Sequence, residues 1–401
     1  SPDADLDAVA GKVTALPDSS ERFEMLAALL TAIGNARGQR GLGPLVQEMT
    51  AADQRFSSWP PERLRGQLTL GWFHVFGLDG ALGASTHTEA YHRARRQHDY
   101  ECVLALGGSA GMSQALGGHI ATALKVSTAR PDEPRGNGWM RMDELRRATH
   151  AAALCYSGQF TRAADELDEL VESGVGNGPE PIAMLLLRLG RLVDETRGRN
   201  NGTRVLDALE LIRSRRQLLY LALVSLETVD LAVGEEATQS LATALPVGDC
   251  GLIALAGRCF EARREHRAAD LLDDGLCLEA GCLVGPALRV VSDAVRLAGA
   301  HEEIAKPGRA AIVRLLAHWD GTEPWWLDEV PTPRQRGVAS LLVDGASTGE
   351  LAEKLVLSRR TVQNHVQRVY GYLGVHSRQE LIEALTCPAR APLERPPQTW
   401  Q

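Results

Sequence analysis

Residues Ser358–Val375 read S-R-R-T-V-Q-N-H-V-Q-R-V-Y-G-Y-L-G-V, which is the pattern of an amphipathic helix followed by a turn. One face is apolar, with residues at helical spacing: Val362, Val366, Val369 and Leu373. Ser358 stands where a helix N-cap belongs, and Gly374 suits the left-handed residue that ends a helix. We therefore expect one helix across most of this stretch.

The outer face of this expected helix carries groups suited to DNA. Three amides lie off the apolar face and are able to pair with base edges: Gln363, Asn364 and Gln367. Three cations are placed to contact phosphates: Arg359, Arg360 and Arg368. The ordinary alternative is a solvated helix start with surface amides, and the residues alone leave both interpretations open.

The neighbouring segments predict a compact unit of four helices. Residues 332–344 and 348–355 form short apolar-periodic segments, and Val356-Leu357 is expected to turn tightly into Ser358. The run S-R-Q-E from Ser377 has capping-box spacing and opens a last helix. Its apolar residues are Leu381, Ile382 and Leu385. Two helices joined by a short turn, the second with an amide-rich outer face, have helix-turn-helix geometry.

Four blocks in this region resemble the LuxR-type helix-turn-helix family. They are Thr332-x-Arg334, Glu350-Leu351-Ala352, Ser358-x-x-Thr361-Val362-x-x-His365 and Leu373-Gly374-Val375-x-x-Arg378. The resemblance implies a bacterial transcription regulator that binds double-stranded promoter DNA as a homodimer. It implies base contacts from Gln363, Asn364 and Gln367. It implies phosphate contacts from Ser358, Arg359, Arg360, Thr361 and Arg368. For a homodimer we expect the last helix, with Leu381, Ile382 and Leu385, to form the pairing face; the alternative left open is that these three residues are only core.

The sequence departs from the family pattern in several places. Gln363 replaces a frequent lysine, and Gln335 replaces a favoured glutamate. Val356 stands where the turn often has glycine, so a positive φ there predicts strain. Gly371, inside the recognition helix, is expected to cost about 1 kcal/mol relative to alanine.

Charge is distributed unevenly along the 401 residues. Residues 330–387 contain seven Lys/Arg and five Asp/Glu, and the last fourteen residues carry a net +1. Because the whole chain carries −8, residues 1–329 carry −11. Such a body would repel DNA, whereas the C-terminal unit would not. We therefore expect the body to sense an effector or assemble with a partner.

Residues 6–129 read as successive amphipathic helices separated by glycine-containing breaks. The expected helices are Ser20–Ala36, Pro44–Gln54, Pro60–Phe76, Thr86–Gln97 and Met112–Ser127. The run Gly107–Gly111 is expected to be a turn between helices. Residues 130–138 form the clearest interior loop.

The second half of the body contains two similar segments. Arg162–Asp168 reads R-A-A-D-E-L-D and Arg267–Asp273 reads R-A-A-D-L-L-D, 105 residues apart, which is three times 35. Tetratricopeptide repeats have a period of about 34 residues, so we expect helix pairs of that kind, with a further degenerate copy at Gly234–Ala237. This arrangement resembles the C-terminal part of the large ATP-binding LuxR regulators, in which the nucleotide-binding part precedes the repeats.

The expected fold class is therefore all-α: a tetratricopeptide-like helical-repeat body followed by a four-helix LuxR-type domain. The expected divisions are an N-terminal helical region 1–130, repeats 139–318, a linker 319–331, the DNA-binding domain 332–387 and a disordered tail 388–401. Trp325 and Trp326 in the linker are expected to pack on the body. Without an initiator Met, the chain is expected to be a processed product or part of a longer protein.

The sequence contains no pattern typical of catalysis or of a bound cofactor. It lacks a phosphate-binding G-x-x-x-x-G-K-[ST], an H-E-x-x-H and a G-x-S-x-G. Four of the seven cysteines lie close in sequence: Cys250, Cys259, Cys277 and Cys282. Their spacing matches no zinc pattern, and we expect reduced core cysteines, no metal and no cofactor.

Three hypotheses of function remain open at this point. The leading one is a cytoplasmic, sequence-specific transcription regulator, not an enzyme, with RNA polymerase or another protein as a further partner and no membrane association. The second is a protein-binding scaffold or anti-activator whose DNA-binding module is degenerate. The third is a signalling ATPase subunit, which requires sequence that this chain does not contain.

Overall fold

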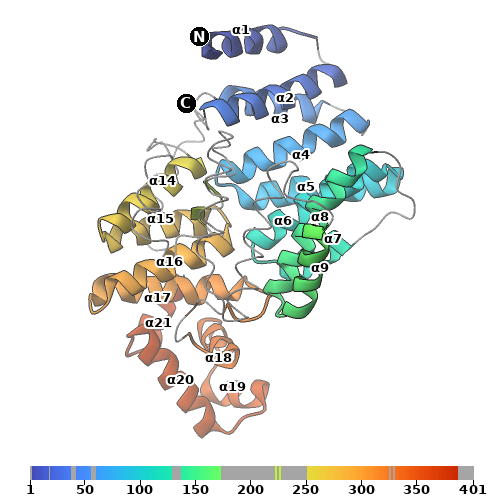
Figure 1. The fold of residues 1–401 in the computed structure, drawn as a ribbon. Coiled ribbons are helices and arrows are strands. Elements are labelled where there is room, and N and C mark those ends of the chain that lie inside the picture. Colours follow the sequence, from blue (N-terminus) through green and yellow to red (C-terminus); the bar gives the residue numbers. More distant parts are fainter. Residues whose placement is uncertain are drawn as a thin grey trace.

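The computed structural model is all-helical throughout the part of the chain that it describes (Figure 1). That part comprises residues 2–17, 19–37, 42–55, 60–128, 137–172, 222–223, 225–226, 251–324, 327 and 330–386. None of the helices in these ranges is long and apolar enough to cross a bilayer. The expected all-α class is confirmed for these residues.

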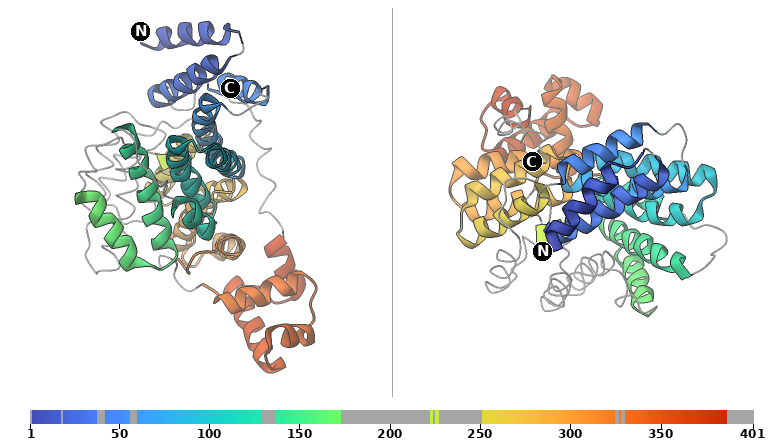
Figure 2. Two further views of the ribbon diagram at one scale, coloured as in Figure 1. Left: turned by 90° about the vertical axis from the view of Figure 1, so that its right-hand side faces the viewer. Right: turned by 90° about the horizontal axis from the view of Figure 1, so that it is seen from above.

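The described helices fall into three groups along the chain. The N-terminal lobe contains α1 (Pro2–Thr14), α2 (Ser20–Arg37), α3 (Gly43–Gln54), α4 (Pro61–Phe76), α5 (Gly80–Gln97), α6 (Tyr100–Leu116), α7 (Ile120–Thr128), α8 (Asn137–Tyr156) and α9 (Phe160–Glu172). The C-terminal lobe contains α14 (Gly251–Arg264), α15 (Ala268–Ala280), α16 (Val284–Ala298) and α17 (Glu302–Ala317). The module contains α18 (Pro333–Val343), α19 (Thr348–Leu355), α20 (Arg359–Leu373) and α21 (Arg378–Thr386). The module projects from the end of the body opposite α1 (Figure 2).

Most of the helices expected in the N-terminal lobe are present, but one of them is divided in two. The expected helix Met112–Ser127 is two helices, α6 and α7, because Gly118 adopts a left-handed conformation with φ 85°. Glycine reaches this conformation without steric cost and so breaks the helix there. The helix expected from Thr86 begins earlier, at Gly80, where Asp79 accepts a hydrogen bond from the Leu82 backbone N–H.

The run Gly107–Gly111, which was expected to be a turn, is instead the buried middle of α6. A Cβ added to Gly108 would lie 2.9 Å from the Leu145 side chain and 3.1 Å from the backbone nitrogen of Arg146, both in α8. The Thr149 hydroxyl donates to the Gly108 carbonyl at 3.2 Å. The glycines therefore allow α6 and α8 to cross closely. Their role is in this crossing, and they lie within α6 instead of ending it.

Six of the described junctions between body helices share one recurring turn. Its left-handed residue is Leu78, His98, Gly118, Gly158, His266 or Cys282. In each turn that residue's N–H bonds the carbonyl three residues earlier, and the next N–H bonds the carbonyl five residues earlier. This is the Schellman motif. The first three turns are 20 residues apart, which is compatible with a helical-repeat body, while the tetratricopeptide assignment stays a prediction.

The two R-A-A-D segments occupy different positions relative to these turns. Arg162 lies within α9, four residues after the left-handed Gly158. Arg267 directly follows the left-handed His266 and caps α15. The two R-A-A-D segments are 105 residues apart, whereas the turns at Gly158 and His266 are 108 residues apart. The segments are therefore offset by three residues relative to the turns.

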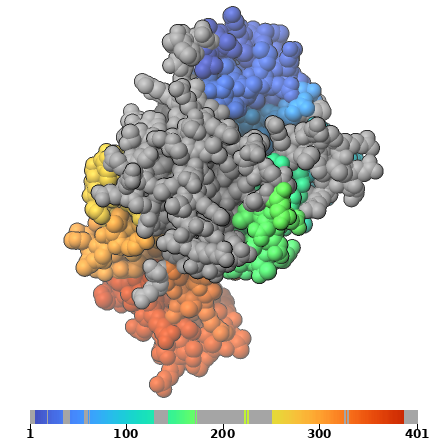
Figure 3. Space-filling model, in the orientation of Figure 1, coloured from blue at the N-terminus to red at the C-terminus, as the bar shows by residue number. Residues whose placement is uncertain are grey.

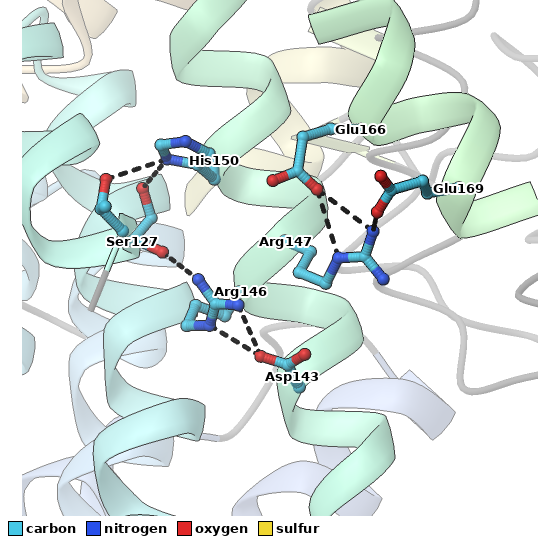
Figure 4. Close-up of polar contacts among 8 residues, drawn as sticks. Ser127, Asp143, Arg146, Arg147, His150, Glu166 and Glu169 are labelled. Atoms are coloured by element: carbon cyan, nitrogen blue, oxygen red, sulfur yellow. Dashed lines mark hydrogen bonds and ion pairs between the residues drawn. The ribbon is translucent and has the colours of Figure 1, made fainter. Parts of the chain in front are cut away.

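Buried polar side chains hold the N-terminal lobe together. Arg146, 2% exposed, pairs with Asp143 at 2.6 Å and donates to the Ser127 carbonyl at the end of α7 (Figure 4). His87 is fully buried, with its Nδ1 2.8 Å from the Ser113 hydroxyl and its Nε2 2.9 Å from the Leu68 carbonyl. Burial lowers the pKa of His87 to about 4, so this imidazole is neutral in the folded protein.

The chain leaving α17 is bound to the N-terminal lobe. We call residues 318–323 the strap. Asp320 accepts hydrogen bonds from the backbone N–H groups at the start of α7, from Ile120 and, at 3.1 Å, from Ala121. Thr322 donates to the Tyr156 carbonyl at the end of α8, from its backbone at 2.8 Å and its hydroxyl at 3.0 Å. Trp319 packs edge-on against the Tyr156 ring.

Several predictions concern residues outside those that the structure describes. These residues are Trp325, Trp326, Gly234–Ala237, Cys250, Cys387 and 388–401. Within the described residues, the aromatic contact between linker and body is made by Trp319 against Tyr156.

Candidate nucleic-acid interface

The module begins with two helices that are capped by their own sequence. At α18, Thr332 and Gln335 form a reciprocal capping box, with the Thr332 backbone N–H donating to Gln335 Oε1 at 2.7 Å. At α19, Ser347 and Glu350 do the same. The hydrogen bond from the Ser347 backbone lowers the pKa of Glu350. Gln335 thus performs the capping role of the glutamate that the LuxR pattern favours.

The recognition helix α20 begins and ends where the sequence predicted. Ser358 accepts a hydrogen bond from the Thr361 backbone N–H at 3.1 Å, and its hydroxyl lies 2.8 Å from that of Thr361. Gly374 ends the helix with φ 64°. Three of the four expected apolar residues are buried and the fourth is half-buried: Val362, Val369, Leu373 and Val366. This packing fixes which side of α20 faces outward.

The turn between α19 and α20 is strained at Val356. Its φ is 54°, and the side chain is 88% exposed. A β-branched residue in the left-handed region is a steric outlier. The Leu357 backbone N–H nevertheless bonds the Ala352 carbonyl at 2.9 Å, so the turn is the same Schellman motif as in the body.

The predicted DNA contacts lie together on the open side of α20. The three amide side chains Gln363, Asn364 and Gln367 are exposed, and so are Arg359, Arg360 and Arg368. Among the residues that the structure describes, no carboxylate lies within 4.0 Å of these three arginines. Ser358 and Thr361 are also at this end of α20, although their hydroxyls already participate in the cap. Within the described ranges, this surface combines exposed arginines that have no carboxylate partner with exposed amide side chains.

The three residues predicted for pairing of two modules occupy different environments. Leu381 is completely buried in the module core. Ile382 and Leu385 are half-buried, and Leu385 packs against the same core. Leu381 therefore stabilises the fold of the module itself in this arrangement.

The module rests on α17 of the body through α21 and the end of α20. Ala310 and Val313 of α17 share one apolar cluster with the module core. Arg314 donates to the Ala384 carbonyl of α21 at 3.1 Å. Burial at this contact raises the pKa of Tyr372 to about 12. Figure 1 shows α19 at the far end of the module from α17, and Figure 3 shows the module projecting beyond the body. The predicted contact side chains of α20 are exposed.

Two further residues of the LuxR pattern are partly buried in the module. Arg378 donates to the Leu342 carbonyl at 2.7 Å and so ties the start of α21 to the end of α18. His365 is half-buried, and its Nδ1 has no hydrogen-bond partner among the described residues. The LuxR resemblance includes both residues, but it does not reveal these contacts.

The described cysteines and histidines do not gather into a metal site. Within the described ranges there is no group of three His, Cys, Asp or Glu side chains able to hold an ion. Burial raises the pKa of Cys259 and Cys277, which favours their neutral thiols. Cys282 lies in the turn before α16.

Comparisons with known proteins point to the same segment. Residues 330–385 match the family model for bacterial regulatory proteins of the LuxR family. The chain is 42% identical over 52 residues to a protein of Mycobacterium tuberculosis H37Rv described as an HTH-type transcriptional regulator. It is 46% identical over 50 residues to the Fimbriae Z protein of Escherichia coli K12. These alignments cover 13% and 12% of this chain, but only 6% and 24% of the two relatives.

A shorter relative is covered over most of its length. The spore germination protein GerE of Bacillus subtilis is 39% identical over 54 residues, which are 14% of this chain and 73% of that protein. No solved structure matches the chain. Through its helix-turn-helix segment, the chain belongs to the LuxR family of bacterial regulatory proteins.

Proposed function

We propose that the protein is a sequence-specific, DNA-binding transcription regulator whose helical body senses an effector or a protein partner. The observation that carries this proposal is the outer face of α20. It presents three cations without a described carboxylate partner and three exposed amides on one helix face. Phosphate oxygens and base edges are the ligands that complement such groups.

The arginines supply the contacts that position α20 on the duplex. Arg359 and Arg360 lie in its first turn and Arg368 lies further along, all three exposed. Each phosphate contact releases condensed counterions, so affinity depends on salt. The N-terminus of α20, where Ser358 is the cap, is also a position at which a phosphate can bind favourably.

The amides supply the readout of sequence. With Val362 and Val369 buried, Gln363, Asn364 and Gln367 lie on the outward side. Asn and Gln pair bidentately with adenine N6 and N7, and each good pair discriminates by about 1–3 kcal/mol. We expect half-sites with at least one essential A·T pair.

Two copies of the chain are proposed to bind together on an inverted repeat. Ile382 and Leu385 are the half-buried residues of the proposed pairing face, while Leu381 supports it from the core. Half-sites one helical turn apart, about 34–36 Å, would match a two-fold arrangement of modules.

Selection of bound duplexes from a random pool tests the sequence readout. Gln363→Ala should relax the preference at one base pair and leave non-specific affinity nearly intact. Arg360→Ala is the matched change on the same helix. It should weaken all duplexes alike and reduce the slope of log K against log salt by about 0.9. A motif for Gln363→Ala identical to the parent's, or a guanine-only motif, would refute the base assignment. No salt-dependent binding at all would favour the scaffold alternative.

A further inference from the structure

The strap, residues 318–323, joins parts of the chain that are far apart in sequence. Asp320 supplies the N-terminal cap of α7, whose amides lie about two hundred residues earlier. Thr322 satisfies the last carbonyl of α8 at Tyr156. Neither helix end has these partners in its own flanking sequence, so the positions of α7 and α8 are fixed together with that of the strap.

The strap crosses a place where the lobes meet through a glycine-containing turn, and another such place lies elsewhere in the described part of the chain. At this crossing, the Asp320 backbone N–H bonds the Gly118 carbonyl at 3.0 Å, and a Cβ on Gly118 would lie 2.7 Å from the His318 carbonyl oxygen. At the other, the Gly80 N–H bonds the Gly281 carbonyl at 2.8 Å. Backbone contacts this close tolerate little relative movement, so a shift between the lobes must displace the strap.

The far end of the strap contacts the module. Glu323 pairs with Arg336 of α18 at 3.0 Å, and Arg336 also donates to the Pro331 carbonyl at 2.6 Å. The start of the strap continues directly from α17, on which α20 and α21 rest. The strap therefore touches both the N-terminal lobe and the module.

We propose that the strap is a latch that couples the positions of α7 and α8 to the docking of the DNA-binding module on α17. Closed, with Asp320 and Thr322 bound to the helix ends, it holds the module against α17. Open, it lets the module move away from the body. This proposal rests on the proposed function, because it assigns the regulation of that DNA-binding surface.

Opening the latch should increase DNA affinity for two physical reasons. The body carries most of the negative charge of the chain, and a docked module brings that charge close to the duplex. Two modules bound to two half-sites must also adopt a fixed spacing and orientation. A module that stays docked on its bulky body is less free to reach that geometry. Couplings between regulatory sites commonly change affinity about fivefold or more, and we expect a gain of that size.

The test uses the full chain with Asp320→Ala and Thr322→Val combined. Amide hydrogen exchange of α21 should become faster, because the contact with α17 is released more often. Affinity for a duplex with two half-sites, obtained by selection with the parent protein, should rise about fivefold. Glu323→Ala is a second, milder variant. It cuts the module end of the strap, leaves the caps of α7 and α8 intact, and should act in the same direction.

Asp99→Ala is the matched control. Asp99 caps α6 by accepting from the Cys102 backbone N–H at 3.1 Å, so this change also removes an aspartate cap but touches neither strap nor module. It should leave the exchange of α21 and the DNA affinity at the parent's values. Thr322→Ser retains the hydroxyl and should do the same.

The outcomes separate the latch from the proposed function. Unchanged exchange of α21 in both strap variants would overturn the latch. Faster exchange with unchanged DNA affinity would overturn its regulatory role. If neither parent nor variant binds DNA, the proposed function fails, while the exchange measurement still decides whether the strap holds the module.

Discussion

The body and the module use arginine in opposite ways. In the body, arginines pair across helices: Arg63 with Asp53 at 2.8 Å, and Arg314 with Glu279 at 2.7 Å. On the outer face of α20, the arginines are exposed and have no described carboxylate within 4.0 Å. The paired arginines hold body helices together, whereas the exposed arginines of α20 are available to an external anion, which is the role proposed for them.

The largest expected effect comes from breaking a buried pair in the body. Arg146→Met leaves Asp143 without its partner and the Ser127 carbonyl without its donor (Figure 4). Removing one partner of a buried pair costs about 3–5 kcal/mol, so the free energy of unfolding should fall by that order. Urea denaturation measures it. Arg360→Ala, in the module, is the matched change and should stay within about 0.5 kcal/mol of the parent. Equal losses in the two variants would contradict the comparison.

Lowering the pH should reduce the free energy of unfolding by a smaller amount, and the responsible group is His87 in the body. The pKa of His87 is lowered to about 4 by burial, whereas the unfolded chain binds the proton near 6.5. The neutral imidazole therefore contributes its full stabilisation above pH 6.5, and this is lost as pH falls from 6.5 to 4. The loss should be on the order of 3 kcal/mol.

Chemical denaturation at several pH values between 4 and 7 measures this dependence. His87→Gln retains hydrogen-bonding groups but cannot titrate, so its stability should vary less over the same range. A parent and variant with parallel pH dependences would show that His87 is not the responsible group.

The smallest effect should be a gain of stability in the module. Val356→Gly removes a β-branched side chain from the left-handed region, and this side chain is 88% exposed, so little packing is lost. Removing the backbone strain should stabilise the folded module by about 1–2 kcal/mol. Glycine loses more backbone entropy on folding than valine, so the free energy of unfolding should rise by a net amount of about 0.5–1 kcal/mol.

Calorimetry of the full chain measures this gain. His98→Gly in the body is the counterpart, since His98 has the same left-handed conformation with φ 56° but is not β-branched. Its gain should be smaller. A destabilised Val356→Gly protein would mean that the valine makes a contact that compensates for its strain.

Local signals in the sequence predicted the module well. Ser358 and Gly374 mark the two ends of α20 through their own backbone chemistry, and both positions are confirmed. The helical spacing of the apolar residues also predicted correctly which face of α20 packs into the module core. The individual DNA contacts and the pairing of modules stay predictions, because they depend on a partner surface.

Long-range contacts were not accessible from the sequence. Gly108 lies inside α6 because α8 packs against it, and nothing near Gly107–Gly111 shows which helix that is. Asp320 looks like an ordinary linker residue until α7 is placed beside it. A glycine run therefore has two meanings, a turn or a helix crossing, and only tertiary structure separates them.

The recurring turns of the body have a consequence for how such chains change length. Each turn is closed by two hydrogen bonds to the helix that precedes it, and Leu78, His98 and Gly118 are spaced 20 residues apart. A helix and the turn that follows it form one unit, and two successive helices restore the direction of the chain. A duplication or deletion of two such units, as from Leu78 to Gly118, therefore disturbs the remaining turns least. The number of residues in the body of related chains should then change in steps of this size. The last body helix must still be followed by the strap, because the strap supplies hydrogen bonds to α7 and α8.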